Sequence, residues 1–245
     1  MILNKKYIQI KNLSKKNGKK EIINNISFDI AEGSFHGLLG LNGSGKTTII
    51  KTIVGAYNNY EGKITINNKI NNSPDIKKYI GYVPERPVFP KNEKVLSYLK
   101  YMGTLSGIPI KKAELKAEKL LKEYNLSHLS KNNVNNISSG EKKKIMLIQA
   151  LINDPKILIL DEPASNLDAI SRIEFLNSLI KLNEKGATII ITSHILSEIE
   201  GILTDATFIK DGKLIYNGTI KNIINTHKNL TNAFVFFIKE GGKNV

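Results

Sequence analysis

Apolar and polar residues alternate near the start of the chain, over residues 7–13 and again over 26–30. This period of two is the pattern of a strand with one face in a core and the other in solvent. Short apolar or β-branched runs bounded by turn residues predict further strands. These are expected at 35–39, 62–67, 157–160 and 188–192, with a hairpin around Asp211 and Gly212 formed by 208–209 and 213–216.

Helical spacing of apolar residues is found in the longer segments between these strands. Isoleucines recur at helical intervals from Ile49 onward, which predicts a helix over 46–55. Further helices are expected at 111–124, 140–152, 170–184 and 196–203. Beyond residue 221 the pattern is weaker, and the apolar run 233–238 predicts a last strand.

Strands that alternate with helices along a chain predict an α/β fold. The segment 88–136 breaks this alternation with sequence rich in Lys, Glu, Ala and Leu, and it predicts an inserted helical lobe. We therefore expect one domain over residues 1–245. Its predicted parts are a β-subdomain and central core at 1–87 and 156–220, a helical subdomain at 88–155 and a C-terminal extension at 221–245.

Composition narrows the function classes. The sequence contains no cysteine, which excludes disulfides and thiolate metal sites and fits the cytoplasm. The formal net charge of +14 comes almost entirely from lysines spread along the chain, because arginine occurs only at Arg86 and Arg172. The accompanying Asn and Ile richness is typical of AT-rich coding, so we expect a solvated basic surface and no nucleic-acid partner. A basic face toward an anionic inner leaflet is also compatible with this charge.

A membrane-spanning helix needs ~20 consecutive apolar residues. The apolar runs 157–160 and 189–191 have only the length of strands. Residues 1–6 have no apolar region behind their charges, as a secretion signal would. We expect a soluble or peripheral protein that is made in the cytoplasm.

Residues 40–47, Gly-Leu-Asn-Gly-Ser-Gly-Lys-Thr, match the phosphate-loop pattern G-x-x-x-x-G-K-[ST], between a predicted strand and a predicted helix. Its glycines let backbone N–H groups face phosphate oxygens, and the following helix directs its positive end at the same anion. Lys46 would supply a charge at the β- and γ-phosphates, and Thr47 a hydroxyl for Mg²⁺. The expected nucleotide contacts are Asn42, Gly43, Ser44, Gly45, Lys46, Thr47 and Thr48.

The apolar strand predicted at 157–160 ends in two carboxylates, Asp161 and Glu162. Ligands of α/β folds bind at the carboxyl ends of strands. Asp161 would hold Mg²⁺ through water, and Glu162 would orient or deprotonate an attacking water. An isolated Asp-Glu-Pro favours an ordinary acidic turn, but the phosphate loop upstream favours the catalytic interpretation.

Residues 137–141, Ile-Ser-Ser-Gly-Glu, resemble the Leu-Ser-Gly-Gly-Gln signature of ABC ATPases. Ser138 and Gly140 match the signature, and Ile137 and Glu141 are mild changes. Ser139 replaces a glycine, which keeps the backbone N–H and narrows the range of φ.

Other landmarks of the ABC family follow in the family's order. Residues 82–85 resemble its Q-loop, with Glu85 where glutamine is usual, and residues 165–168 resemble its D-loop, which ends at Asp168. His194 follows an apolar strand, as the family's switch histidine does. The resemblance extends from about residue 7 to about residue 220.

The resemblance implies the ATP-hydrolysing subunit of an ABC transporter, which drives a separate membrane permease from the inner face of the cell membrane. It implies a P-loop NTPase core of the ABC type with an N-terminal antiparallel β-subdomain and an inserted helical subdomain. Such subunits form head-to-tail dimers that enclose ATP between the phosphate loop of one copy and the signature of the other. A homodimer is the simpler expectation, because every motif for two equal sites is present.

The resemblance also assigns roles to single residues. Catalytic roles fall to Lys46, Glu162 and His194, and Mg²⁺ ligation to Thr47, Glu85 and Asp161. Further nucleotide contacts are expected from Ser138, Ser139, Gly140, Glu141 and Asp168. The segment 88–101 would help to form the groove that receives a coupling helix of the permease.

Two departures from the family pattern alter the expectation. Asn17 stands where the family often places an aromatic residue against adenine, so we expect weak discrimination between ATP and GTP. A glutamate at this position of the Q-loop, here Glu85, resembles the Q-loops of exporters of the drug, lipid or peptide type. The alternatives are a soluble ABC ATPase of the iron–sulfur assembly type, a nucleic-acid- or ribosome-acting ABC protein, and a nucleotide sensor that does not hydrolyse ATP.

Overall fold

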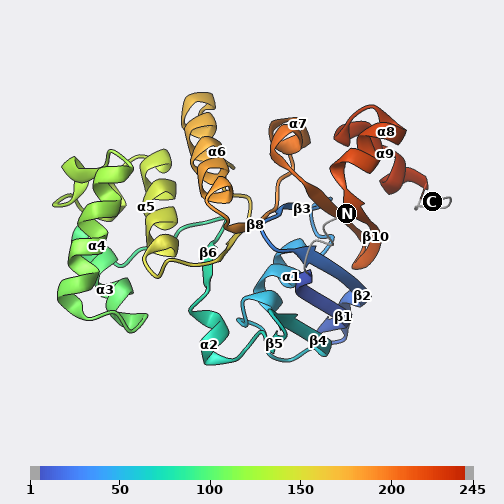
Figure 1. Cartoon of the computed structure of the whole chain (residues 1–245), viewed down its shortest axis with the longest axis horizontal. Helices are drawn as coiled ribbons and strands as arrows, with labels where there is room; N and C mark the ends of the chain where they lie inside the picture. The colour runs from blue at the N-terminus through green and yellow to red at the C-terminus, as the bar shows by residue number, and fades with distance from the viewer. Residues whose placement is uncertain (1–5, 241–245) are drawn as a thin grey trace.

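The computed structural model describes residues 6–240 and arranges them as two β-sheets with helices around them (Figure 1). Residues 1–5 and 241–245 lie outside the described part. They include most of the N-terminal segment in which no secretion signal is expected. Among residues 6–240, no helix is both long and apolar enough to cross a membrane.

The first sheet is antiparallel, with the strand order β2-β1-β4-β5. Its strands are β1 (Lys6–Asn17), β2 (Lys20–Ala31), β4 (Glu61–Ile66) and β5 (Lys69–Ile70). The alternation in the sequence is that of one buried face: Ile10 pairs with Phe28 on one side and with Ile64 on the other, and all three are buried. This face shares a core with helix α1 (Lys46–Ile53), which confirms the predicted antiparallel β-subdomain.

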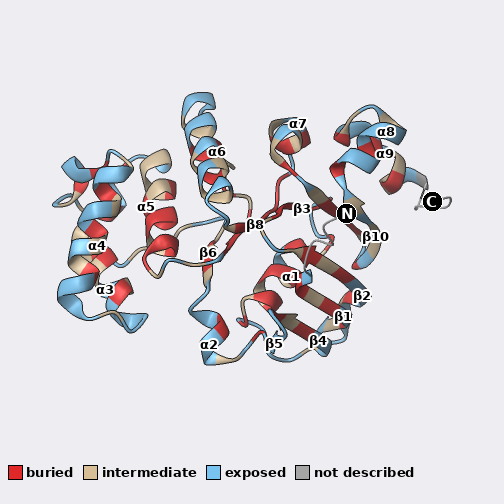
Figure 2. Ribbon diagram, in the orientation of Figure 1, coloured by how far each residue is buried: buried red, intermediate tan, exposed pale blue. Residues whose placement is uncertain are grey.

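The second sheet has the order β10-β9-β3-β8-β7-β6, and only its β9–β10 pair is antiparallel. Its strands are β3 (Phe35–Gly40), β6 (Ile80–Val83), β7 (Ile157–Leu160), β8 (Thr188–Ile191), β9 (Asp205–Lys210) and β10 (Lys213–Thr219). Asp211 and Gly212 both have positive φ, as a two-residue hairpin turn of this kind requires, so the predicted hairpin is confirmed. Every residue of β3, β7 and β8 is buried, as expected for central strands (Figure 2).

Three helices form a lobe with a core of its own at one end of the molecule (Figure 1). They are α3 (Val95–Leu105), α4 (Ile110–Glu123) and α5 (Ser139–Leu151), with short 3₁₀ turns at Ser127–Leu129 and Val134–Asn136. Leu99, Leu121 and Ile145 meet in this core. The inserted helical subdomain is therefore confirmed, while its predicted limits at 88–155 stay a prediction.

The remaining helices are the short α2 (Pro74–Lys77), which lies near β5, and four helices that pack on the second sheet (Figure 1). These four are α6 (Ala169–Glu184), α7 (Leu196–Ile199) with a 3₁₀ turn at Glu200–Ile202, α8 (Ile220–His227) and α9 (Leu230–Glu240). The strand predicted at 233–238 is wrong, because this segment lies within α9. Its buried residues Leu230, Ala233 and Phe237 follow helical spacing, and the Phe237 ring packs against Phe208 of β9.

Candidate nucleotide-binding site

The carboxyl ends of β3, β7 and β8 lie at the same edge of the second sheet, because these strands run parallel. β3 leads into the phosphate loop, β7 into Asp161 and β8 into Thr192. Residues more than a hundred positions apart thus meet at one place, as α/β folds arrange their ligand sites.

The phosphate loop needs glycine for two different reasons. Gly45 has φ +108°, and a Cβ there would stand 2.4 Å from Cδ1 of Ile23. Gly43 has φ +79° with nothing within 4 Å of a Cβ, so its backbone faces open space. The loop therefore presents its backbone to a ligand ahead of α1, whose N-terminus favours anions.

Two polar side chains of this loop, those of Lys46 and Ser44, are buried. Lys46 is buried, and its ammonium donates hydrogen bonds to the carbonyl oxygens of Gly40, at 2.9 Å, and Leu41, at 3.1 Å. Burial lowers the pKa of Lys46, and the nearby Glu162 and Asp161 partly oppose this shift. Ser44 Oγ is buried without a hydrogen-bond partner among the described residues and lies against Gly40 at the end of β3.

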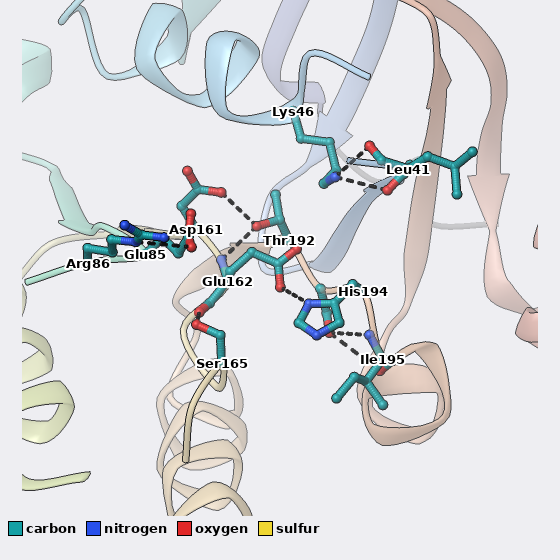
Figure 3. Close-up of polar contacts among 12 residues, drawn as sticks. Leu41, Lys46, Glu85, Arg86, Asp161, Glu162, Ser165, Thr192, His194 and Ile195 are labelled. Atoms are coloured by element: carbon teal, nitrogen blue, oxygen red, sulfur yellow. Dashed lines mark hydrogen bonds and ion pairs between the residues drawn. The ribbon is translucent and has the colours of Figure 1, made fainter. Parts of the chain in front are cut away.

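Thr192 links the two carboxylate residues that follow β7 (Figure 3). Its hydroxyl donates a hydrogen bond to Asp161 Oδ1, at 2.9 Å, and accepts one from the Glu162 backbone N–H, at 2.7 Å. Asp161 and Thr192 are both buried. Glu162 has φ +45°, a left-handed conformation that is uncommon outside glycine and often marks functional sites.

The Glu162 carboxylate points toward His194, as Figure 3 shows. Its Oε2 lies 2.7 Å from Nδ1 of His194. The glutamate side chain is only 14% exposed and the histidine 55%, so the pair joins a sheltered carboxylate to a solvent-facing ring. Ser165 Oγ donates a hydrogen bond of 2.7 Å to the Glu162 carbonyl oxygen and so fixes the turn after β7.

Most of these groups, but not the buried Thr192, line a single cavity of about 590 Å³. Its lining residues are Lys20, Ile22, Asn42, Gly43, Gly45, Lys46, Thr47, Thr48, Glu85, Asp161, Glu162, Ser165 and His194. The cavity therefore collects every residue predicted from the phosphate loop except Ser44. Thr47, Glu85 and Asp161 offer hydroxyl and carboxylate oxygens to it, a donor set that fits Mg²⁺.

The signature residues do not line this cavity. Ser138 is the N-cap of α5 and forms a capping box: Glu141 N–H donates to Ser138 Oγ, and Glu141 Oε2 accepts from Ser138 N–H at 2.8 Å. The Ser138 hydroxyl also donates to Glu141 Oε2, at 2.7 Å, and this bond together with that from the Ser138 N–H lowers the pKa of Glu141. Ser139 is the first residue of the helix and has no positive φ, so the missing glycine is tolerated.

Asp168 also lies outside the cavity, and it caps α6 in the same way. Its carboxylate accepts hydrogen bonds from the backbone N–H and the hydroxyl of Ser171, at 2.9 and 2.6 Å. A Cβ on Gly140 would stand 2.9 Å from Ser171 Oγ, so the signature and the D-loop lie side by side.

The family model described as ABC transporter matches residues 23–165 of the chain. The chain belongs to the ABC transporter family. An ABC transporter ATP-binding protein of Mycoplasma pneumoniae is 39% identical over 220 residues, which cover 88% of this chain and 68% of the relative. The lantibiotic transport ATP-binding protein SrtF of Streptococcus pyogenes is 34% identical over 229 residues, which cover 94% of this chain and 98% of the relative.

Solved structures agree with this assignment. The ATP-binding subunit of an ABC transporter superposes with a TM-score of 0.83 at 26% identity, covering 94% of this chain and 98% of the other. The protein is thus an ATP-binding, ATP-hydrolysing subunit of an ABC transporter, with the P-loop fold that its motifs predict.

The structure of this ABC subunit adds site residues that the sequence did not reveal. Lys20 and Ile22 of β2 line the cavity. Thr192 and Ser165 hold the turn that carries the carboxylates. The sequence signal that could have identified Thr192 as a site residue was its position directly after an apolar strand, at the same edge as Asp161.

Proposed function

We propose that the protein is the motor subunit of an ABC exporter, in which ATP binding and hydrolysis drive substrate movement by a separate permease. The shared cavity of phosphate loop, Asp161, Glu162 and His194 carries the motor part of this proposal. Export is favoured by the relative that serves lantibiotic transport and by Glu85 in the Q-loop. An antimicrobial or similar peptide is the substrate class that fits both.

Residues of the phosphate loop bind the nucleotide in this proposal. Backbone N–H groups from Asn42 to Thr48 and the Lys46 ammonium contact the phosphates. Lys46 leaves its carbonyl partners for the β- and γ-phosphates. Thr47, Glu85 and Asp161 would hold Mg²⁺, which neutralises charge on the phosphate oxygens when bound.

Glu162 is the proposed general base of ATP hydrolysis. Its carboxylate accepts a proton from the water that attacks the γ-phosphate. His194 lies within hydrogen-bond reach of that carboxylate and orients it. Thr192 places Asp161 and Glu162 relative to each other through one hydroxyl.

A second copy of the chain completes the site in this proposal. Ser138, Ser139, Gly140, Glu141 and Asp168 lie off the cavity of their own chain and would face the nucleotide bound by the partner. The N-terminus of α5 suits the γ-phosphate there. Loss of the γ-phosphate weakens the contact, so hydrolysis opens the dimer.

The permease would dock beside the Q-loop, which places the subunit on the cytoplasmic face of the membrane. Val88 is 85% exposed and Tyr101 59% exposed, so the segment 88–101 offers apolar side chains to a coupling helix. The proposed contact joins the partner to the helical subdomain and, through Glu85, to the nucleotide site.

Purification of the tagged chain from its own cells, after mild solubilisation of the membranes, tests the proposal. A polytopic membrane protein at comparable stoichiometry is the expected partner. Recovery without one, together with assembly factors or ribosomes, would contradict the transporter role and favour a soluble or nucleic-acid-acting ABC ATPase.

A further inference from the structure

Lys143 is a buried lysine in the second turn of α5, only 4% exposed. Its ammonium donates hydrogen bonds to the carbonyl oxygens of Pro84, at 3.4 Å, and Glu85. These carbonyls belong to the segment directly after β6, whereas Lys143 belongs to the helical subdomain. One side chain thus joins the helix that follows the signature to the backbone of the Q-loop.

Two neighbouring lysines on the same helix behave differently. Lys142 Nζ donates to the carbonyl oxygen of Asn135, at 2.8 Å, within the helical subdomain. Lys144 Nζ forms an ion pair with Glu174 Oε2, at 2.6 Å, on α6. Neither of them contacts the Q-loop through these bonds, so the contact depends on the position of Lys143 and not on the basic character of the helix.

Burying an ammonium is costly unless charges or hydrogen bonds compensate. Burial lowers the pKa of Lys143 to about 8, and the negative charges of Glu85, Asp161 and Glu162 oppose this shift. These three acidic residues also line the nucleotide cavity. The lysine therefore belongs to the electrostatic environment of the site although its own side chain does not line the cavity.

We propose that Lys143 is a positioning residue that sets the Glu85 carboxylate in the nucleotide site by fixing the Q-loop backbone to α5. The proposal rests on the proposed role of Glu85 toward Mg²⁺. Two hydrogen bonds to successive carbonyls restrain both position and rotation of the peptide that carries Glu85. Because α5 begins with the signature, the same side chain connects the Q-loop to the surface that would face the second copy.

Equilibrium binding of a fluorescent ATP analogue, titrated with Mg²⁺ in the Glu162→Gln background, tests this role without turnover. Lys143→Met keeps the length of the aliphatic stem and removes the donors. We expect the half-saturating Mg²⁺ concentration to rise about tenfold, while binding without Mg²⁺ stays within twofold. Lys144→Met is the matched control and leaves both values unchanged, and Lys143→Arg, which retains donors, restores most of the Mg²⁺ response.

A double-mutant cycle with Glu85→Ala shows whether Lys143 acts through Glu85. Lys143→Met should change the Mg²⁺ response less than twofold once Glu85 is absent. The full tenfold effect in that background would overturn the proposal. A normal Mg²⁺ response in the Lys143→Met single variant would overturn it too. Where Lys143→Met melts below assay temperature, Lys143→Gln takes its place in this test. A normal Mg²⁺ response in Glu85→Ala alone would instead remove Glu85 from the proposed function.

Discussion

At the scale of single residues, the Thr192 hydroxyl connects the end of β8 to the two residues that follow β7. It bonds the carboxylate of Asp161 and the backbone N–H of Glu162 at the same time. The bond to Asp161 is buried and the bond from Glu162 is partly buried, and shielding from water strengthens such hydrogen bonds. Placement of the proposed metal ligand and of the proposed base therefore depends on one oxygen atom.

Thr192→Val replaces that hydroxyl by a methyl group of similar size. We expect kcat for ATP hydrolysis to fall about 10- to 100-fold, because small misplacement of catalytic groups has effects of this size. Steady-state ATPase kinetics should show a KM within about threefold of the original. Thr192→Ser keeps the hydroxyl and should retain most activity; an unchanged kcat in Thr192→Val would contradict the positioning role.

His36 is a second buried polar residue, and it affects stability more than chemistry. It is the second residue of β3 and is fully buried, with Nε2 2.8 Å from Thr207 Oγ1 and the ring stacked on Phe28. Its Nδ1 has no hydrogen-bond partner among the described residues. Burial lowers the pKa of His36 from 6.5 to about 3, which means that the folded protein keeps this ring neutral.

The depressed pKa of His36 makes stability depend on pH in a defined direction. Below pH 6.5 the unfolded chain binds a proton that the folded chain refuses until about pH 3, so stability is lost as pH falls through this window. Between pH 7.5 and 5 the loss should reach about 2 kcal/mol. Urea denaturation of the wild type and of His36→Gln measures it: the variant should lose about that much less over the same interval. Equal pH dependence in the two proteins would contradict the assignment.

At the scale of secondary-structure elements, the β1–β2 hairpin contributes a wall of the cavity beside the phosphate loop. Lys20 and Ile22 line it, while the exposed Asn17 stands where the family often has an aromatic ring. Base stacking on an aromatic residue contributes roughly 1–3 kcal/mol, and neither lining side chain replaces it. The aliphatic side chain of Ile22 and the ammonium of Lys20 make no contact that needs the amino group of adenine, so they do not select adenine over guanine.

We therefore expect ATP and GTP to compete for the site with affinities that differ less than about tenfold. Asn17→Tyr should strengthen ATP binding by about fivefold or more, since it restores a stacking surface. Displacement of a fluorescent nucleotide by ATP and GTP measures both values. A strong preference of the wild type for ATP would show that Lys20 and Ile22 recognise the base by themselves.

Most elements of this fold could be predicted because their patterns are local. The period of two in β1 and β2 and the uninterrupted apolar runs of β3, β7 and β8 correspond to real burial. The pattern of the run 233–238 does not distinguish a strand from a helix, because consecutive aromatic and aliphatic residues fit a strand and a buried helix equally well. Its helical state depends on tertiary contacts, such as that of Phe237 with Phe208, and on the hydrogen bond that the Leu230 N–H at the start of α9 donates to Glu200 Oε1.

The same division between local patterns and long-range contacts holds for the nucleotide-binding site. The phosphate loop, Asp161 and Glu162 could be predicted because each lies in a contiguous motif, and the structure brings them together. The contacts of Thr192 and Lys143 could not, since they join residues 31 and 58 positions apart in the chain, although the place of Thr192 after an apolar strand indicated that it lies at this edge. A lysine among three consecutive lysines carries no sequence signal that it is the buried one.

At the scale of the whole molecule, the site within one chain is incomplete for the proposed reaction. The signature and the D-loop lie side by side but away from the cavity, and each begins a helix with a satisfied cap. The Ser138 N–H and hydroxyl both donate to Glu141 Oε2, so they would have to leave that carboxylate to meet an anion held elsewhere. A head-to-tail pair of identical chains would bring two such surfaces to two cavities.

Glu162→Gln should make this pairing visible. The amide cannot accept a proton from water, so turnover should fall at least about 100-fold, whereas its size and its contact with His194 preserve ATP binding. Light scattering during gel filtration should then show a mass of twice 27.3 kDa in ATP and Mg²⁺, and the single mass without nucleotide. Adding Lys46→Ala, which removes a phosphate contact, should abolish the dimer.

Normal turnover in Glu162→Gln would exclude Glu162 as the base. A monomer that still binds ATP would mean that the signature of a different chain completes the site.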